Sequence, residues 1–163
     1  MRALLLLSGL LGVTLAADEP AADDTKSIQG TWVLTGLEVN GKPIGDSVRG
    51  VGLKVHIKGG EITFQNKEGM DKGKDKPPTG TFKIDPNKTP KTIDTTYNKE
   101  SVEQGIYSLE GDGTLKLCVA KVGGKRPSEF KTKEGDGTRL FIFKREGDLG
   151  KDKEKDKDKA KDK

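Results

Sequence analysis

Two short apolar stretches frame the part of the chain that decides the fold: GTWVL at residues 30–34 and LFIFKR at residues 140–145. Between them, apolar and polar residues alternate in short runs separated by Gly, Pro, Asn and Asp, which is typical of strands joined by turns. No segment between them predicts a helix. We expect strands at residues 28–39, 48–57, 61–65, 79–84, 91–97, 103–109, 114–120 and 138–145. About eight such strands predict an all-β fold, a single antiparallel up-and-down β-barrel.

The apolar phase of these strands predicts the barrel interior. A barrel of about eight strands either is filled by its own side chains or encloses one small ligand. Several of the inward residues are large, so we expect one half to be filled, while the sequence leaves open whether the other half holds a ligand. The residues expected to line the interior are Trp32, Leu53, Val55, Ile57, Phe64, Phe82, Leu117 and Phe141.

The N-terminus has the composition of a signal peptide over residues 1–16. Arg2 precedes an apolar stretch, and small residues lead to an expected cleavage site after Ala16. The stretch is short for a bilayer span and is followed by acidic residues, so we expect no stable membrane insertion; a retained N-terminal anchor is the alternative. The sequence therefore predicts an extracytoplasmic protein, periplasmic or secreted.

Polar segments flank the predicted barrel, which we place at residues 28–146. Residues 17–27 are expected to form a flexible acidic leader, and residues 147–163 a disordered tail of alternating Lys and Asp. Such a tail buries no apolar area that would offset its ordering entropy; a surface-binding role for it is the alternative. The formal net charge is +4, but aromatic and basic residues are not interleaved as in nucleic-acid interfaces, so we expect no nucleic-acid partner.

Few residues offer chemistry. Cys118 is the only cysteine, so the chain forms no intramolecular disulfide. We expect it to be a small apolar strand residue, with an intermolecular disulfide as the alternative. His56 is the only histidine and lies on the polar phase of its strand, whereas metal sites and catalytic triads draw on several such residues. We therefore expect no metal, no cofactor and no catalytic residue, with a hydrolytic enzyme as a residual alternative.

The start of the first strand carries a resemblance to lipocalins. The segment GTW at residues 30–32 resembles their Gly-x-Trp motif, in which a basic residue of the last strand packs against the Trp and helps to close the barrel. Applied to this chain, the resemblance implies a closure formed by Gly30, Trp32 and Arg145, with Lys144 as the alternative basic residue. A helix covers part of the outer barrel wall in lipocalins, and this sequence predicts none.

A wider set of segments resembles an uncharacterised lipocalin-like domain family of secreted planctomycete proteins. The resemblance implies a lipocalin-like barrel and export, and it brings no established activity and no catalytic residues. The segments that carry it are IQGTW at 28–32, EVNGKP at 38–43, GTFKIDP at 80–86, GIY at 105–107, LKLC at 115–118 and RPSEF at 126–130.

The first and last strands also have apolar residues on the phase expected to face outward. Val33 and Leu37 lie on this phase of the first strand, and Leu140 and Ile142 on that of the last. Because these strands are neighbours in a closed barrel, we predict a continuous outer patch that contacts a second copy or another protein. The alternative is that twist and loops bury these residues within one chain.

The sequence thus predicts a non-catalytic, exported module that binds a small apolar or amphipathic ligand. The alternative is a structural or protein-interaction domain whose barrel is completely filled.

Overall fold

The structure is a computed structural model that describes residues 23–44, 52–65, 79–97 and 101–149. The predicted signal peptide and most of the predicted tail lie outside these residues. Within the described ranges, no helix has the length and apolar composition needed to cross a bilayer. The elements are α1 (Asp24–Ser27), β1 (Gly30–Val39), β2 (Lys42–Pro43), β3 (Lys54–Lys58), β4 (Glu61–Gln65), β5 (Thr79–Asp85), β6 (Thr92–Tyr97), β7 (Ser101–Glu110), β8 (Thr114–Val119), β9 (Arg139–Arg145) and the 3₁₀ turn η1 (Glu146–Asp148).

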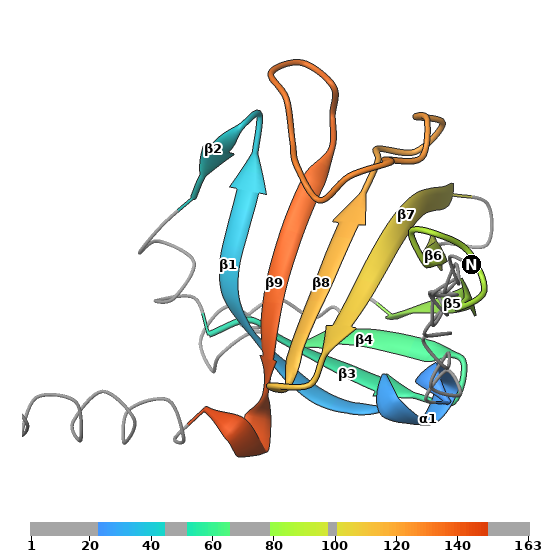
Figure 1. The fold of residues 1–163 in the computed structure, drawn as a ribbon, viewed down its shortest axis with the longest axis vertical. Helices are drawn as coiled ribbons and strands as arrows, with labels where there is room; N and C mark the ends of the chain where they lie inside the picture. Colours follow the sequence, from blue (N-terminus) through green and yellow to red (C-terminus); the bar gives the residue numbers. More distant parts are fainter. Residues whose placement is uncertain (1–22, 45–51, 66–78, 98–100, 150–163) are drawn as a thin grey trace, which may run out of the picture.

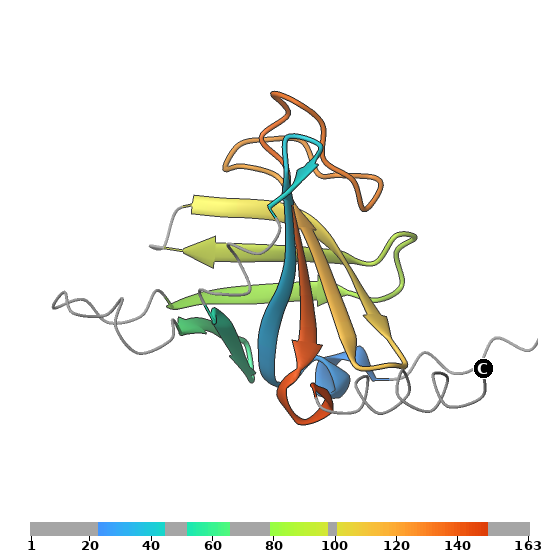
Figure 2. The same cartoon turned by 90° about the vertical axis from the view of Figure 1, so that its left-hand side faces the viewer.

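The strands form one antiparallel barrel in which sequence neighbours pair, from β3 through to β9 (Figure 1). β1 pairs with β3 on one side and with β9 on the other, which closes the barrel with eight strands. Figure 2 shows β1 and β9 running side by side along this seam. β2 is a short additional strand on β1 that the sequence did not predict. The all-β, up-and-down barrel predicted from the alternation of apolar residues is confirmed.

A bulge in β1 changes which residues of this strand face inward. The pairing with β9 shifts between Leu34 and Gly36. The inserted residue reverses the facing of the rest of the strand. Leu37 therefore packs against the interior cluster, although simple alternation placed it outside with Val33.

One end of the barrel is filled with side chains. Trp32, Ile57 and Tyr107 are at most 1% exposed there, and Ile28 and Leu115 are fully buried. The indole Nε1 of Trp32 donates a hydrogen bond to the Ile28 carbonyl oxygen at 2.9 Å. This end of the interior has the close packing of a core.

α1 closes the filled end. The Asp24 carboxylate, 3% exposed, accepts hydrogen bonds from the Tyr107 hydroxyl at 2.6 Å and from Lys91 Nζ at 2.7 Å. Burial, followed by the contact with Asp24, raises the pKa of Tyr107. Residues 23–27 thus belong to the packed domain, which corrects the prediction of a flexible leader for this part of residues 17–27. The hydrogen-bond partners of Asp24 lie far along the chain and could not be seen in local composition.

The connection between β8 and β9, residues 120–138, folds over the outer wall of the barrel. A second apolar cluster forms beneath it from Ile106, Cys118 and Leu140, with Phe130 and Ile142 packed against them. Phe130 therefore packs against the outer wall of the barrel. The predicted outer patch is largely covered within the chain, so the surface expected to contact a second copy or a protein partner is not a continuous apolar face among the described residues.

Cys118 lies under this connection. It has no exposed surface, and its Sγ is 3.8 Å from the Lys131 carbonyl oxygen. Burial raises the pKa of the thiol to about 11. An intermolecular disulfide would require the connection to leave the wall, so the structure favours the prediction of a small apolar strand residue.

Candidate binding site

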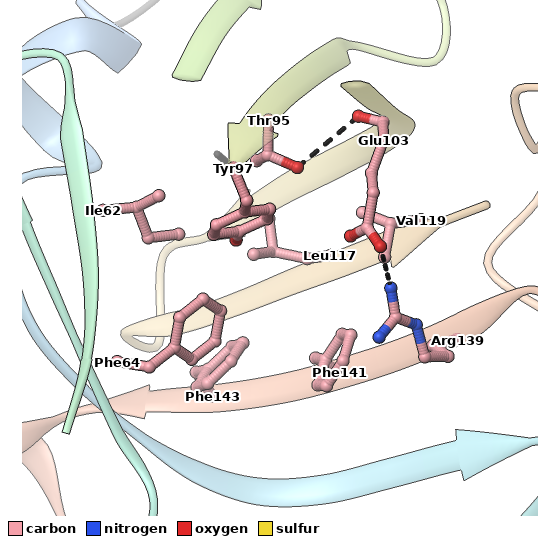
Figure 3. Close-up of a pocket in the computed structure, with 10 residues that line it drawn as sticks. All are labelled: Ile62, Phe64, Thr95, Tyr97, Glu103, Leu117, Val119, Arg139, Phe141 and Phe143. Carbon is pink, nitrogen blue, oxygen red and sulfur yellow. Dashed lines mark hydrogen bonds and ion pairs between the residues drawn. The ribbon is translucent and has the colours of Figure 1, made fainter. Parts of the chain in front are cut away.

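A cavity of about 330 Å³ occupies the end of the barrel away from α1 (Figure 3). The two ends of β9 show that the cavity and α1 lie at opposite ends of the barrel. At the end of β9, Arg145 donates hydrogen bonds to the Ser27 and Gln29 carbonyl oxygens beside α1, and at its start Arg139 lines the cavity. The lining comes from β4, β6, β7, β8 and β9. It consists of Ile62, Phe64, Thr95, Tyr97, Glu103, Leu117, Val119, Arg139, Phe141 and Phe143.

Aromatic rings form much of the wall. Phe141 and Phe143 lie nearly parallel, with ring centroids 6.1 Å apart and an angle of 18° between the planes. Phe64 contacts Tyr97 at a centroid distance of 6.0 Å with a tilt of 45°. Figure 3 shows Phe64, Phe143 and Phe141 in a row that ends near Arg139. A flat apolar group would find ring faces and edges to pack against along this row.

The position of Tyr97 depends on a glycine in the neighbouring strand. Gly80 of β5 pairs with Tyr97 of β6, and a Cβ at Gly80 would lie 2.7 Å from the Tyr97 ring. The missing side chain lets the ring lie flat across β5. Burial, with a smaller contribution from the negative charge of Glu103, raises the pKa of Tyr97 to about 12. The phenol is therefore neutral near pH 7, and its ring contributes to the cavity wall.

A charged pair lies at the rim of the cavity. The Arg139 guanidinium donates from Nη2 to Oε1 of Glu103, and Thr95 Oγ1 lies 3.5 Å from the Glu103 carbonyl oxygen. Arg139 also lies over Phe141, with its Cζ 5.7 Å from the ring centroid. The side chain of Glu103 is 17% exposed and that of Arg139 is 39% exposed. The cavity thus has an apolar body and one polar end whose charges are opposite and adjacent.

The structure divides the predicted interior residues into two groups. Phe64, Leu117 and Phe141 line the cavity. Trp32, Val55 and Ile57 lie in the filled core, so they cannot contact a ligand in this cavity. Leu53 and Phe82 are partly buried and pack against the same core cluster.

Sequence reasoning missed the polar members of the site, Tyr97, Glu103 and Arg139. The strand phase carries the signal, because Arg139 has the same phase as Phe141, and Glu103 the same phase as buried Tyr107.

The structure brings together the residues that the Gly-x-Trp resemblance implies for the closure. The Cζ of Arg145 lies 4.2 Å from the centroid of the Trp32 ring, a close cation–π distance. Gly30 has a φ of +118°, and a Cβ there would lie 3.0 Å from Arg145 Nη1. Glycine at this position therefore both permits the backbone conformation and leaves space for the guanidinium. Lys144, the alternative, instead contacts the Asp112 carboxylate at 2.9 Å.

His56 lies outside the interior, where its Nδ1 forms a hydrogen bond with Thr31 Oγ1 at 3.1 Å. In the described part of the chain, no three His, Cys, Asp or Glu side chains gather in a group that could hold a metal ion. Among the described residues, the cavity lining combines apolar side chains with Thr95, Tyr97 and one charged pair at the rim. Comparisons of the chain with protein-family models, with curated proteins and with solved structures find no match.

Proposed function

We propose that this protein is an exported, non-catalytic lipocalin-like module that holds a small amphipathic molecule in the barrel cavity. The observation that carries the proposal is the 330 Å³ cavity, which combines an aromatic and aliphatic wall with a single charged pair. Small-molecule sites have this composition: mostly apolar walls and a few placed polar groups.

The size of the cavity limits the ligand. Small-molecule sites range from about 300 to 1,000 Å³, so this one is at the small end. A compact molecule with one ring or two fused rings suits this space, whereas a long acyl chain would extend out of it. The filled half below the cavity supports the walls, which favours a preformed site.

A neutral fluorescent probe tests the proposal. Prodan, a naphthalene ketone whose emission shifts to the blue in apolar surroundings, should bind the wild-type protein saturably. Val119→Phe places a larger side chain into the cavity and should weaken binding by about tenfold, because the ligand then loses apolar contact area.

Val102→Phe is the matched control, because Val102 lies on β7, is 41% exposed and does not line this cavity. It should bind prodan like the wild type. Thermal melting of each variant shows that binding is measured on folded protein. Absence of saturable binding to wild type, or equal affinity in the Val119→Phe variant, would overturn the proposal.

A second measurement looks for the natural ligand. Protein purified without detergent and extracted into organic solvent should release a co-purified small molecule detectable by mass spectrometry. The filled-barrel alternative predicts repeated absence of such a molecule together with no prodan binding.

A further inference from the structure

The charged pair at the cavity rim has unused hydrogen-bonding capacity on both sides. The contact between Arg139 and Glu103 uses Nη2 of the guanidinium and Oε1 of the carboxylate. Within the described part of the chain, the other guanidinium nitrogens and Oε2 of Glu103 make no further hydrogen bond. The rim therefore presents donors beside an acceptor, both next to the end of the aromatic row (Figure 3).

Because Arg139 and Glu103 are adjacent and opposite in charge, the rim disfavours a ligand that carries a single charge. A carboxylate alone would gain from Arg139 but would meet the like charge of Glu103, and an ammonium alone would meet that of Arg139. A head that carries both charges can place its carboxylate toward Arg139 and its ammonium toward Glu103 without separating the pair. Charge-assisted hydrogen bonds of this kind are stronger than neutral ones.

The body of the ligand follows from the walls. Two ring pairs, Phe64 with Tyr97 and Phe141 with Phe143, enclose a space that suits one flat apolar group. From these walls and the rim pair, we infer that the site binds a small aromatic zwitterion of the α-amino acid type. This inference rests on the proposed function and specifies the ligand class of the same cavity.

The test keeps the aromatic body constant and changes only the head. Phenylalanine, 3-phenylpropionate, phenethylamine and the neutral 3-phenylpropanamide each compete with prodan for the wild-type protein. Phenylalanine should bind about tenfold more tightly than either singly charged analogue, since each analogue loses one charge-assisted contact and gains one repulsion. The amide tests whether a donor and an acceptor without charge are sufficient.

Charge-removing variants give a second readout. In Glu103→Gln, the preference for phenylalanine over 3-phenylpropionate should disappear, because the repulsion of the lone carboxylate is gone. In Arg139→Gln, the preference for phenylalanine over phenethylamine should disappear, because the repulsion between the lone ammonium and the guanidinium is gone. Glu146→Gln is the matched control, since it removes an ion pair with Lys54 outside the cavity, and it should leave the preference order unchanged.

The outcomes distinguish failure of the zwitterion inference from failure of the proposed cavity binding. If the four compounds compete equally, if the amide matches phenylalanine, or if none displaces bound prodan, the zwitterion inference is wrong while cavity binding stands. If prodan itself does not bind, both are wrong. The wild-type series alone decides the inference should either variant fail to fold.

Discussion

At the scale of single residues, two glycines determine where aromatic and cationic side chains lie. Gly30 leaves room for the Arg145 guanidinium over Trp32, and Gly80 leaves room for the Tyr97 ring in the cavity wall. In both cases the functional feature of the glycine is the absence of a Cβ. A sequence pattern shows that a glycine is present, but it does not show which distant side chain occupies the space beside it.

Gly80→Ala should therefore destabilise the protein and alter the cavity. The new methyl group would lie 2.7 Å from the Tyr97 ring and 2.8 Å from the Thr96 carbonyl oxygen, so both the ring and the local backbone must shift. We expect the free energy of unfolding in urea to fall by about 1–3 kcal/mol, together with weaker prodan binding. Gly60→Ala is the control, because no atom lies within 4 Å of its added Cβ. Equal stability of the two variants would contradict this account of Gly80.

Cys118 should be protected from thiol reagents in the folded protein. It is fully buried, and with a pKa of about 11 only about one thiol in a thousand is ionised at pH 8. Reaction with Ellman's reagent at pH 8 should be slow in buffer and fast in 6 M guanidinium chloride. Rapid labelling of native protein, or a disulfide-linked dimer on a non-reducing gel, would show that the β8–β9 connection does not cover the thiol.

At the scale of elements, turns and connections hold the strands through specific polar contacts. Arg126 attaches the β8–β9 connection to two strands, because it donates to the Ile93 and Gly105 carbonyl oxygens at 3.1 and 2.6 Å and to the Asp94 carboxylate at 2.6 Å. The β7–β8 turn is held by Asp112, whose carboxylate accepts hydrogen bonds from the Thr114 amide at 3.0 Å and from Lys144 Nζ at 2.9 Å.

The Asp112 contacts should make stability depend on pH in the acid range. The hydrogen bond with the Thr114 side chain, followed by that with Lys144, lowers the pKa of Asp112 to about 2, below the value of about 3.9 in an unfolded chain. Because this pKa is lower in the folded state, the ionised carboxylate stabilises the protein fully when the pH is above the unfolded-state pKa. This stabilisation is lost as the pH falls through about 2. Asp112→Asn should lower the melting temperature at pH 5 but reduce its decline between pH 4 and pH 2. Parallel melting curves for the variant and wild type across this range would contradict the assignment.

At the scale of the whole molecule, the barrel has two halves with different roles. The half near α1 is a packed core sealed by a buried carboxylate, and the other half holds the cavity. The separation allows the core to supply stability while the cavity keeps exposed polar groups and unfilled volume, which are costly to stability but useful for binding.

Asp24→Ala tests this division. The substitution leaves the buried Tyr107 hydroxyl and Lys91 without their shared partner, so the free energy of unfolding should fall by about 2–4 kcal/mol. The loss is smaller than for a fully buried ion pair because Lys91 is partly exposed to solvent. Prodan affinity of the folded variant should be unchanged, because the cavity lies at the other end. Asp23→Ala, which removes a solvent-exposed ion pair with Lys26, should leave the unfolding curve unchanged. Weakened prodan binding in folded Asp24→Ala protein would show that the two halves are coupled.

The sequence by itself determined the strands and their order, because alternation of apolar residues and turn-forming residues are local signals. Residues 61–65 were predicted with the bounds that β4 has, and the other predicted strands of the barrel overlap β1, β3 and β5–β9. The resemblance to the Gly-x-Trp motif implied that Trp32 contacts Arg145 or Lys144, and the structure places Arg145 over the ring.

The tertiary structure alone decided which interior positions are filled and which line the cavity. It also decided the bulge that turns Leu37 inward, the burial of Asp24 by Tyr107 and Lys91, and the pairing of Glu103 with Arg139. Each of these depends on contacts between residues distant along the chain and on the exact volume left between side chains. Alternation specifies a face of a strand but not the height of a residue in the barrel, and height separates the core from the cavity.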